Sequence, residues 1–296
     1  MTRTDDQRGV ALLIGSALGF SLMSVQVKLA GEELPVATLV LARGVVTLVL
    51  SATWLAHRRI SPWGNDKKRL LLRAVLGVGG LGCFFYALTV LPLAEATVIH
   101  YLNPLLTALV AAFFLREAIR PSVLIAIALA LAGTVLIARP AVLFGAANVA
   151  PLSGVLAALG GATFSAFAYT TVRRLRLTDD PHVIVFYFPL VAVPATLPFA
   201  IASWRTPSAT GWLLLLGLGV ATQVSQVLLT MGLALVPAGR ATTIGYVQIL
   251  FAAGLGFLVF GERPGLTSAL GALLIVSGVL VLVRRPAAPS PENSGP

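Results

Sequence analysis

The chain has 296 residues, of which 57% are hydrophobic and 11% charged, and its mean hydropathy is +0.93. Soluble domains carry about 25% charged residues, and lipid-facing surfaces exclude charge because its transfer into hydrocarbon is costly. The composition therefore excludes an ordinary soluble protein. The formal net charge of +10 falls in short segments between apolar runs, which favours anionic lipid headgroups over nucleic acid as the partner.

Ten apolar runs follow one another, each close to the ~20 residues that a helix needs to cross a bilayer. In chain order they cover residues 9–27, 34–56, 70–90, 94–115, 119–138, 151–172, 182–203, 211–235, 238–260 and 265–283. Two junctions, Leu91-Pro92 and Val236-Pro237, are tight and could also be kinks inside longer helices. Two neighbouring spans fused there would be too long for one helix, so we predict turns. The runs predict an all-α integral membrane protein with ten transmembrane helices. Ten helices can enclose a pathway, so we expect a functional monomer.

Lys and Arg are unevenly divided between the connecting segments. Sixteen fall on one side of the predicted membrane and four on the other, while Arg43 lies inside the second run. Cytoplasmic segments are enriched in Lys and Arg. The split therefore predicts that the N- and C-termini are both cytoplasmic, and it agrees with an even number of spans.

The two halves of the chain repeat each other. Tyr101 matches Tyr246 and Glu117 matches Glu262, both at an offset of 145 residues. Each half has five runs, and an odd number makes the second half enter the membrane from the opposite side. Inverted repeats are the usual construction of secondary transporters, which hold substrate near the midplane and alternate access. The predicted units are residues 1–140, the first five-helix repeat, 150–285, the second, and 286–296, a disordered tail.

Each half closes with an apolar helix, a Glu and a glycine-containing last helix. The segments are Phe113-Phe114-Leu115-Arg116-Glu117 and Phe260-Gly261-Glu262-Arg263-Pro264. With the five-plus-five organisation, they resemble the EamA-type ten-helix branch of the drug/metabolite transporter superfamily, over residues 9–285. Within it the chain looks most like the bacterial YddG-type aromatic amino-acid exporters. The resemblance implies a multi-pass transporter of the bacterial inner membrane that exports amino acids, aromatic or small neutral ones, and related metabolites through a central cavity.

Polar side chains inside a span usually face the bundle interior or a water-filled cavity, so they are candidates for the substrate pathway. His100 and Asn103 share a helix face, and Pro104 removes a backbone hydrogen bond beside them. Interhelical hydrogen bonding and core packing are the competing explanations for such residues. The candidate set is His100, Tyr101, Asn103, Tyr246, Gln248, Gln223, Gln226, Arg43, Phe20, Met23, Ser24, Phe164, Phe167 and Tyr169.

Two further features of the runs have more than one interpretation. Arg43 could hold a substrate carboxylate, or it could snorkel or bind backbone carbonyl groups near a helix end. Pro189, Pro194 and Pro198 in the seventh run predict a bent or broken helix.

No Asp or Glu lies in the middle of any run. Glu95, Glu117 and Glu262 lie at run ends, where we expect the last two to cap or orient turns. Proton-coupled carriers commonly use buried carboxylates, so the sequence favours facilitated transport or exchange. The alternative is proton-coupled export of other metabolites or drugs.

Catalytic and metal-binding patterns are missing from the sequence. It has no phosphate-binding Gly-x-x-x-x-Gly-Lys-Ser/Thr loop and no Gly-x-Ser-x-Gly elbow, which argues against ATP hydrolysis and against an intramembrane enzyme. Cys83 is the only cysteine, so neither a disulfide nor a thiolate metal site can form. We expect no metal and no cofactor, and a small-molecule substrate and membrane lipids as the partners.

Overall fold

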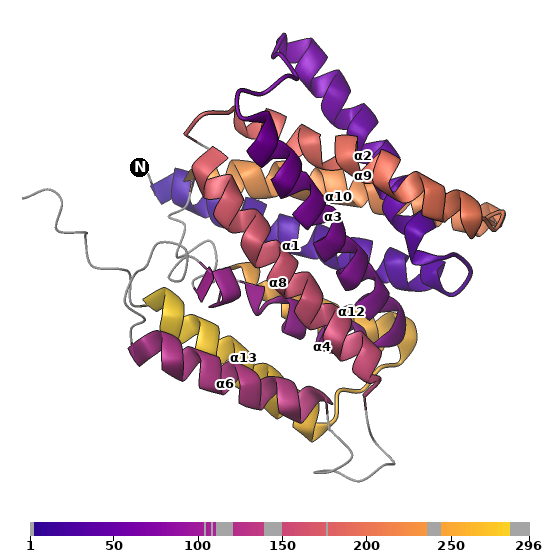
Figure 1. Ribbon diagram of the computed structural model, residues 1–296. Helices are drawn as coiled ribbons and strands as arrows, with labels where there is room; N and C mark the ends of the chain where they lie inside the picture. The colour runs from indigo at the N-terminus through magenta and orange to yellow at the C-terminus, as the bar shows by residue number, and fades with distance from the viewer. Residues whose placement is uncertain are drawn as a thin grey trace, which may run out of the picture.

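The structure is a computed structural model that describes residues 3–103, 105–107, 109–110, 121–138, 150–175, 177–235 and 244–284. All regular secondary structure in these ranges is helical (Figure 1). The helices are α1 (Arg3–Gly31), α2 (Val36–Arg58), α3 (Lys67–Val90), α4 (Leu93–His100), α6 (Pro121–Ala138), α8 (Leu152–Leu175), α9 (Pro181–Ala202), α10 (Ala209–Leu235), α12 (Val247–Phe260) and α13 (Leu266–Arg284). The predictions for Pro104, Glu117, Val236-Pro237 and the tail over 286–296 lie outside the described residues.

Six of the described helices, α1, α2, α3, α8, α9 and α10, are long and apolar enough to cross a membrane, and two shorter apolar helices lie in α12 and α13. Their outward faces are apolar, as lipid requires. On α10, for example, large apolar side chains between 42% and 71% exposed recur at helical spacing, namely Leu213, Leu216, Val220, Val224 and Val227. The full count of ten spans, and their orientation, stay predictions.

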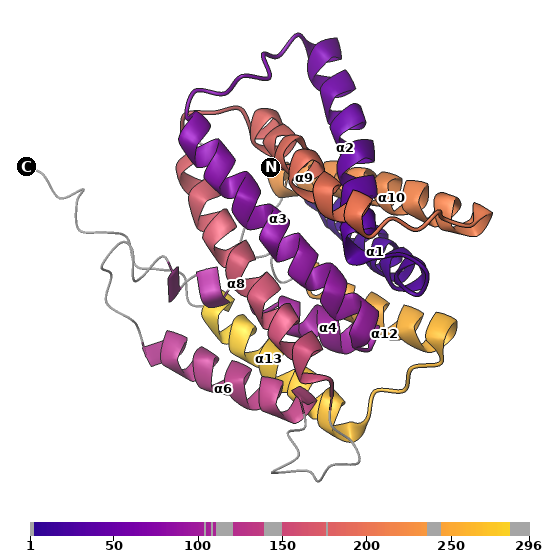
Figure 2. The same cartoon turned by 45° about the vertical axis from the view of Figure 1, so that its right-hand side comes forward.

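The helices pack mainly across the two halves of the chain. α1 lies against α10, α3 against α8, α2 against α9, α4 against α12 and α6 against α13. By the 145-residue offset, α1 corresponds to α8 and α3 to α10, so the first two pairs are equivalent. The α2–α9 and α6–α13 pairs each join a helix to its own counterpart, and the α4–α12 pair joins helices of the fourth and ninth runs. Inverted repeats related by a two-fold axis produce this pattern. α2 and α9 form one edge of the bundle, and α6 and α13 form the opposite edge (Figure 2).

The α3–α4 junction is a turn, as the sequence predicts at Leu91-Pro92, because α3 ends at Val90 and α4 begins at Leu93. The seventh run was predicted to be bent or broken, and the structure shows that it is not broken. Three prolines lie inside α9, which nevertheless runs without interruption. Neighbouring helices let a membrane helix tolerate proline, and α2 packs along α9.

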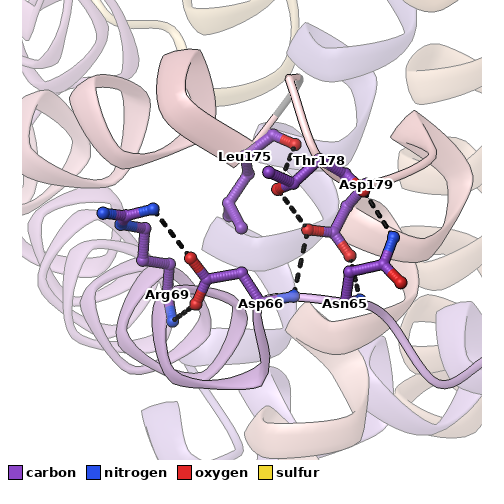
Figure 3. A network of polar contacts seen from close by, with 6 residues as sticks. All are labelled: Asn65, Asp66, Arg69, Leu175, Thr178 and Asp179. Atoms are coloured by element: carbon purple, nitrogen blue, oxygen red, sulfur yellow. Dashed lines mark hydrogen bonds and ion pairs between the residues drawn. The ribbon is translucent and has the colours of Figure 1, made fainter.

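A carboxylate ties the α8–α9 loop to the start of α3 (Figure 3). Asp179 Oδ1 accepts a hydrogen bond from the backbone N–H of Asn65 at 2.5 Å, and Oδ2 accepts from the Thr178 hydroxyl at 2.7 Å and the Asp66 N–H at 3.3 Å. Asp66 in turn caps α3 by accepting from the Arg69 N–H at 3.1 Å. The α3–α8 pair is thereby closed at one end, which we call the first end of the bundle.

The equivalent tie lies at the other end of the bundle, the second end. Glu33 in the α1–α2 loop accepts from the backbone N–H of Ser208 at 2.5 Å and from its hydroxyl at 2.9 Å, just before α10. In each repeat, the loop after the first helix therefore supplies a carboxylate to the third helix of the other repeat. The two long antiparallel pairs, α1–α10 and α3–α8, are held in register by matching contacts.

Asp179 makes stability depend on pH. Burial acts to raise the pKa of Asp179, but hydrogen bonds from the Thr178 hydroxyl and the N–H groups of Asn65 and Asp66 outweigh it and hold that pKa below its usual 3.8. A depressed folded-state pKa contributes stability above the unfolded value, and the contribution is lost as pH falls through the folded value.

We expect Asp179→Asn to lower the free energy of unfolding by about 1–3 kcal/mol at pH 7, since the amide keeps only one, uncharged, acceptor oxygen in place of two charged ones. The difference between variant and wild type should shrink below about pH 4. Thermal unfolding in detergent across pH measures it. Subtracting the profile of the variant from that of the wild type isolates the contribution of Asp179. Parallel profiles for the two proteins would contradict this role of Asp179.

The α6–α13 pair depends on a backbone contact between two glycines. A Cβ atom on Gly133 would lie 2.5 Å from the Gly271 carbonyl oxygen, and one on Gly271 would lie 2.6 Å from the Gly133 oxygen. Small residues let membrane helices approach this closely. By contrast, a Cβ on Gly82 of α3 would have no atom within 4 Å.

Gly133→Ala should therefore force the two backbones apart and destabilise the protein by about 1–3 kcal/mol. Gly82→Ala is the control, and it should be neutral or stabilising by up to about 1 kcal/mol, because alanine is the better helix former. Thermal unfolding of both variants in the same detergent compares them. Equal shifts would show that the glycine contact does not set the spacing of α6 and α13.

Candidate functional site

A cavity of about 290 Å³ lies among α1, α2, α3, α8, α9 and α10, with side chains of α4 and of residues 245–248 completing its wall. Its volume is at the lower end of the range for small-molecule sites. No Asp or Glu is among the described residues that line it. Ten of the predicted site residues do line it: Phe20, Met23, Arg43, His100, Tyr101, Asn103, Tyr169, Gln223, Gln226 and Gln248.

The cavity has a cationic wall made by Arg43 of α2 and Arg73 of α3. Both guanidinium groups lie over the ring of Phe188, with Cζ at 5.5 Å and 5.4 Å from its centroid, and Arg43 also lies 5.6 Å from the centroid of Phe85. Arg43 is 9% exposed. Cation–π contacts are worth about 0.5–2 kcal/mol each, less than the cost of burying a charge.

Neither arginine has its hydrogen-bonding capacity satisfied. Nε of Arg43, and Nε and Nη1 of Arg73, are buried and have no partner within the described residues. Arg43 therefore does not bind backbone carbonyl groups through this nitrogen. Buried donors of this kind are costly unless something accepts from them, and here they adjoin a cavity.

The two repeats meet beside the cavity at a pair of tyrosines, one from each repeat. Tyr101 follows the last residue of α4, and Tyr246 precedes the first residue of α12. The helices of the fourth and ninth runs are therefore interrupted at equivalent positions of the two repeats. Their rings lie 5.3 Å apart. The Tyr101 hydroxyl lies 2.7 Å from Gln248 Oε1 and 3.1 Å from the Gly245 carbonyl oxygen. Interrupted helices at the repeat interface are where such transporters bind substrate.

His100 lies beside this junction. Its ring stacks on Phe84, with centroids 4.2 Å apart and planes at 26°, and its Nδ1 is buried without a hydrogen-bond partner in the described part of the chain. A Cβ on Gly161 of α8 would lie 3.4 Å from that nitrogen. This part of the cavity wall therefore presents two aromatic rings and one nitrogen, Nδ1 of His100, that has no hydrogen-bond partner in the described part of the chain.

Four predicted site residues do not line the cavity. The Ser24 hydroxyl bonds to the Phe20 carbonyl of its own helix, and Tyr246 is buried against Tyr101. Phe164 and Phe167 are absent from the part of the lining that α8 contributes, which consists of Ser165, Ala168 and Tyr169. Phe164 packs over Gly79 and Gly80 of α3 instead.

Arg73 and Phe188 line the cavity but are not among the predicted site residues. Arg73 follows a basic cluster and was counted with the connecting segments, yet it lies in the second turn of α3. A signal was available, since Arg73, Gly77 and Gly80 recur at i, i+4 and i+7 on one helix face, and all three line the cavity. Phe188 and the hydroxyls of Thr47, Ser51 and Ser165 carried no comparable signal.

A second polar cluster closes the second end of the bundle. The ammonium group of Lys28 on α1 forms an ion pair with Glu262 and donates to the Leu91 carbonyl at 2.7 Å. Glu262 Oε2 accepts from the Leu93 N–H at 2.8 Å and so caps α4. Gly261, with φ of +65°, ends α12 and turns Glu262 toward this cluster. The predicted role of Glu262 in orienting turns is confirmed.

The cavity lies toward the first end. Arg73, Tyr169 and Val185 line it within about two turns of that end. Between the cavity and the second end lies the largest buried apolar cluster, which includes side chains at most 3% exposed: Val27, Leu34, Leu39, Leu88, Leu91 and Leu93. The described structure is therefore sealed on the side of the Lys28–Glu262 pair.

Comparison with known proteins identifies relatives along the whole chain. A model of the EamA-like transporter family matches residues 7–139 and again 152–284. The chain is 30% identical over 277 residues to a pseudopaline exporter, CntI, of Pseudomonas aeruginosa, covering 93% of this chain and 96% of that protein. It is 25% identical to solute carrier family 35 member G1 of Homo sapiens, covering 91% and 77%. A solved crystal structure matches in fold with a TM-score of 0.62 at 23% identity, covering 96% of this chain and 99% of the other.

Proposed function

Because the chain belongs to the EamA-like transporter family, we propose that it is a secondary transporter of the bacterial inner membrane that exports amino acids and related metabolites. Its relatives are transporters along nearly its whole length. Aromatic and small neutral amino acids are the first candidates, since Phe20, Phe84 and Phe188 offer apolar surface beside polar groups. A monomer is sufficient for this function.

The proposal that the substrate is an amino acid rests on the environment of Arg43. Arg43 is 9% exposed, its Nε has no partner, and it lines a cavity with no acidic side chain among its described residues. An arginine in that setting suits a carboxylate, which it binds through two parallel hydrogen bonds. Gln223, Gln226 and Gln248 lie on other walls of the same cavity and can hydrogen-bond a substrate's amino group.

The position of the cavity supports export by alternating access. The first end carries the predicted cytoplasmic loops, and the cavity lies toward it, while the second end is sealed by Lys28 and Glu262. Substrate would bind from the cytoplasm. Rocking of the repeats would then open the second end and close the first.

Facilitated transport or exchange fits this cavity better than proton coupling. Its described lining has no carboxylate, and His100 is its one side chain that titrates near neutral pH in water. An imposed pH gradient across the vesicles should therefore change transport little. A strong dependence of transport on the gradient would favour the proton-coupled alternative.

Counterflow tests the proposal. Proteoliposomes with the purified protein, preloaded with an unlabelled amino acid, should accumulate the labelled form of the same amino acid, with phenylalanine, threonine and glutamate as the first probes. Protein-free liposomes are the control. No accumulation of any amino acid tried would reject amino acids as substrates. The second candidate would then be export of another metabolite, as the name of the Pseudomonas relative indicates for that protein.

A further inference from the structure

We infer that the preferred substrate of this cavity carries two anionic groups, one for each of Arg43 and Arg73. This rests on the proposed transport function and narrows it from amino acids in general to acidic amino acids or amino-acid-derived dicarboxylates. A neutral amino acid supplies one carboxylate and leaves the second guanidinium without a partner.

The charge balance of the cavity is the first argument. Two permanently charged side chains line it, and no Asp or Glu is among its described lining residues. Both guanidinium groups contact the same Phe188 ring, so two like charges share one wall of the cavity and repel each other in a medium of low dielectric constant. A dianion neutralises both, whereas a monoanion leaves one positive charge.

The unused donors are the second argument. Three guanidinium nitrogens, Nε of Arg43 and Nε and Nη1 of Arg73, are buried and have no hydrogen-bond partner among the described residues. They come from two different helices, α2 and α3. Nε and one Nη of an arginine form the edge that binds a carboxylate in a bidentate manner. On the side of the Nε hydrogen that second nitrogen is Nη2, so Arg43 and Arg73 each have the Nε half of this edge free within the described residues, and Nη1 of Arg73 is a further free donor.

The remaining walls limit the rest of the substrate. Phe84, Phe188 and Tyr169 line the same cavity, so an apolar or planar portion can lie between the charged groups and the Tyr101–Gln248 contact. A cavity of about 290 Å³ excludes large polyanions. The class is therefore a small dicarboxylate, with or without an amino group.

Matched pairs of probes test this on the unmodified protein. Glutamate and glutamine, and succinate and succinamate, have nearly the same size and differ by one negative charge. In counterflow, we expect half-maximal inhibition by glutamate and succinate at concentrations at least tenfold lower than by their amides. Because wild type is used, this result does not depend on the folding of a variant.

Variants of Arg73 then test whether this residue causes the preference for the probe with the additional negative charge. Arg73→Gln should bring the ratio of inhibitory concentrations within each pair close to one, and Arg73→Lys should restore part of it. Arg69→Gln is the matched control, since Arg69 is on the same helix, pairs with Asp66 and does not line the cavity. This control should keep the wild-type ratio.

The outcomes separate this inference from the proposed function. Counterflow of neutral amino acids with no preference for glutamate or succinate would overturn the two-anion inference and leave the transporter assignment intact. An Arg73→Gln protein that folds and keeps the wild-type preference would overturn the role of Arg73. Absence of counterflow with every probe, glutamate and succinate included, would reject both proposals.

Discussion

Replacing Glu262 by alanine is expected to lower the free energy of unfolding by about 3 kcal/mol, since breaking a largely buried ion pair leaves an uncompensated charge. The side chains of Lys28 and Glu262 are 17% and 16% exposed. The same substitution also removes the acceptor for the Leu93 N–H. Thermal unfolding in detergent, followed by tryptophan fluorescence, measures the loss.

Glu262→Gln is the matched variant, because its amide oxygen can still accept from the Leu93 N–H while the charge is removed. We expect a smaller loss of stability for Gln than for Ala. Lys28→Met should recover part of the stability of Glu262→Ala, since it removes the charge that Ala leaves unpaired. Wild-type stability in both Glu262 variants would contradict the account of the second end.

Arg43→Gln is expected to have the largest effect on transport. A charge-assisted hydrogen bond contributes about 1.5–3 kcal/mol, so losing the guanidinium should lower the apparent affinity for carboxylate substrates by about 10- to 100-fold. Counterflow measured as a function of substrate concentration gives this value. Arg58→Gln, at the exposed end of the same helix beside Trp54, is the control and should transport like wild type.

A folded Arg43→Gln protein with wild-type affinity would remove Arg43 from the site. Arg43→Lys distinguishes charge from geometry. If lysine keeps the affinity, the site recognises charge alone, and if it does not, the planar guanidinium is needed to hold the carboxylate.

The sequence was most informative where a periodic pattern directly encodes the structure. Apolar runs predicted the helices because lipid demands continuous apolar surface, and the Leu91-Pro92 turn was predictable from proline chemistry. The 145-residue offset placed Tyr101 and Tyr246 at equivalent positions, and the structure brings their rings together. The three prolines of α9 suggested a broken helix, but the helix is continuous. Whether a membrane helix tolerates proline depends on its neighbouring helices, which a local pattern does not show.

The site was only partly predictable, because a cavity is defined by contacts between distant segments. Arg43 stood out as a charge inside an apolar run, whereas Arg73 stood beside other basic residues and looked like part of a loop. The tie between Asp179 and Asn65 joins residues far apart in sequence, and no local signal marks it. Phe164 and Phe167 were of a suitable type but do not line the cavity, and Phe164 packs over Gly79 and Gly80 of α3.

The central claim is that the transported substrate binds in this cavity, and substrate protection of a cysteine tests it most directly. Thr47→Cys, in a Cys83→Ser background, places a thiol on the cavity wall one turn from Arg43. The control is Thr53→Cys, on the same helix but exposed and outside the lining. A substrate that undergoes counterflow should slow maleimide labelling of Thr47→Cys at concentrations near its transport affinity and leave Thr53→Cys unaffected. Unchanged labelling of Thr47→Cys at saturating substrate, in a variant that still transports, would contradict the claim.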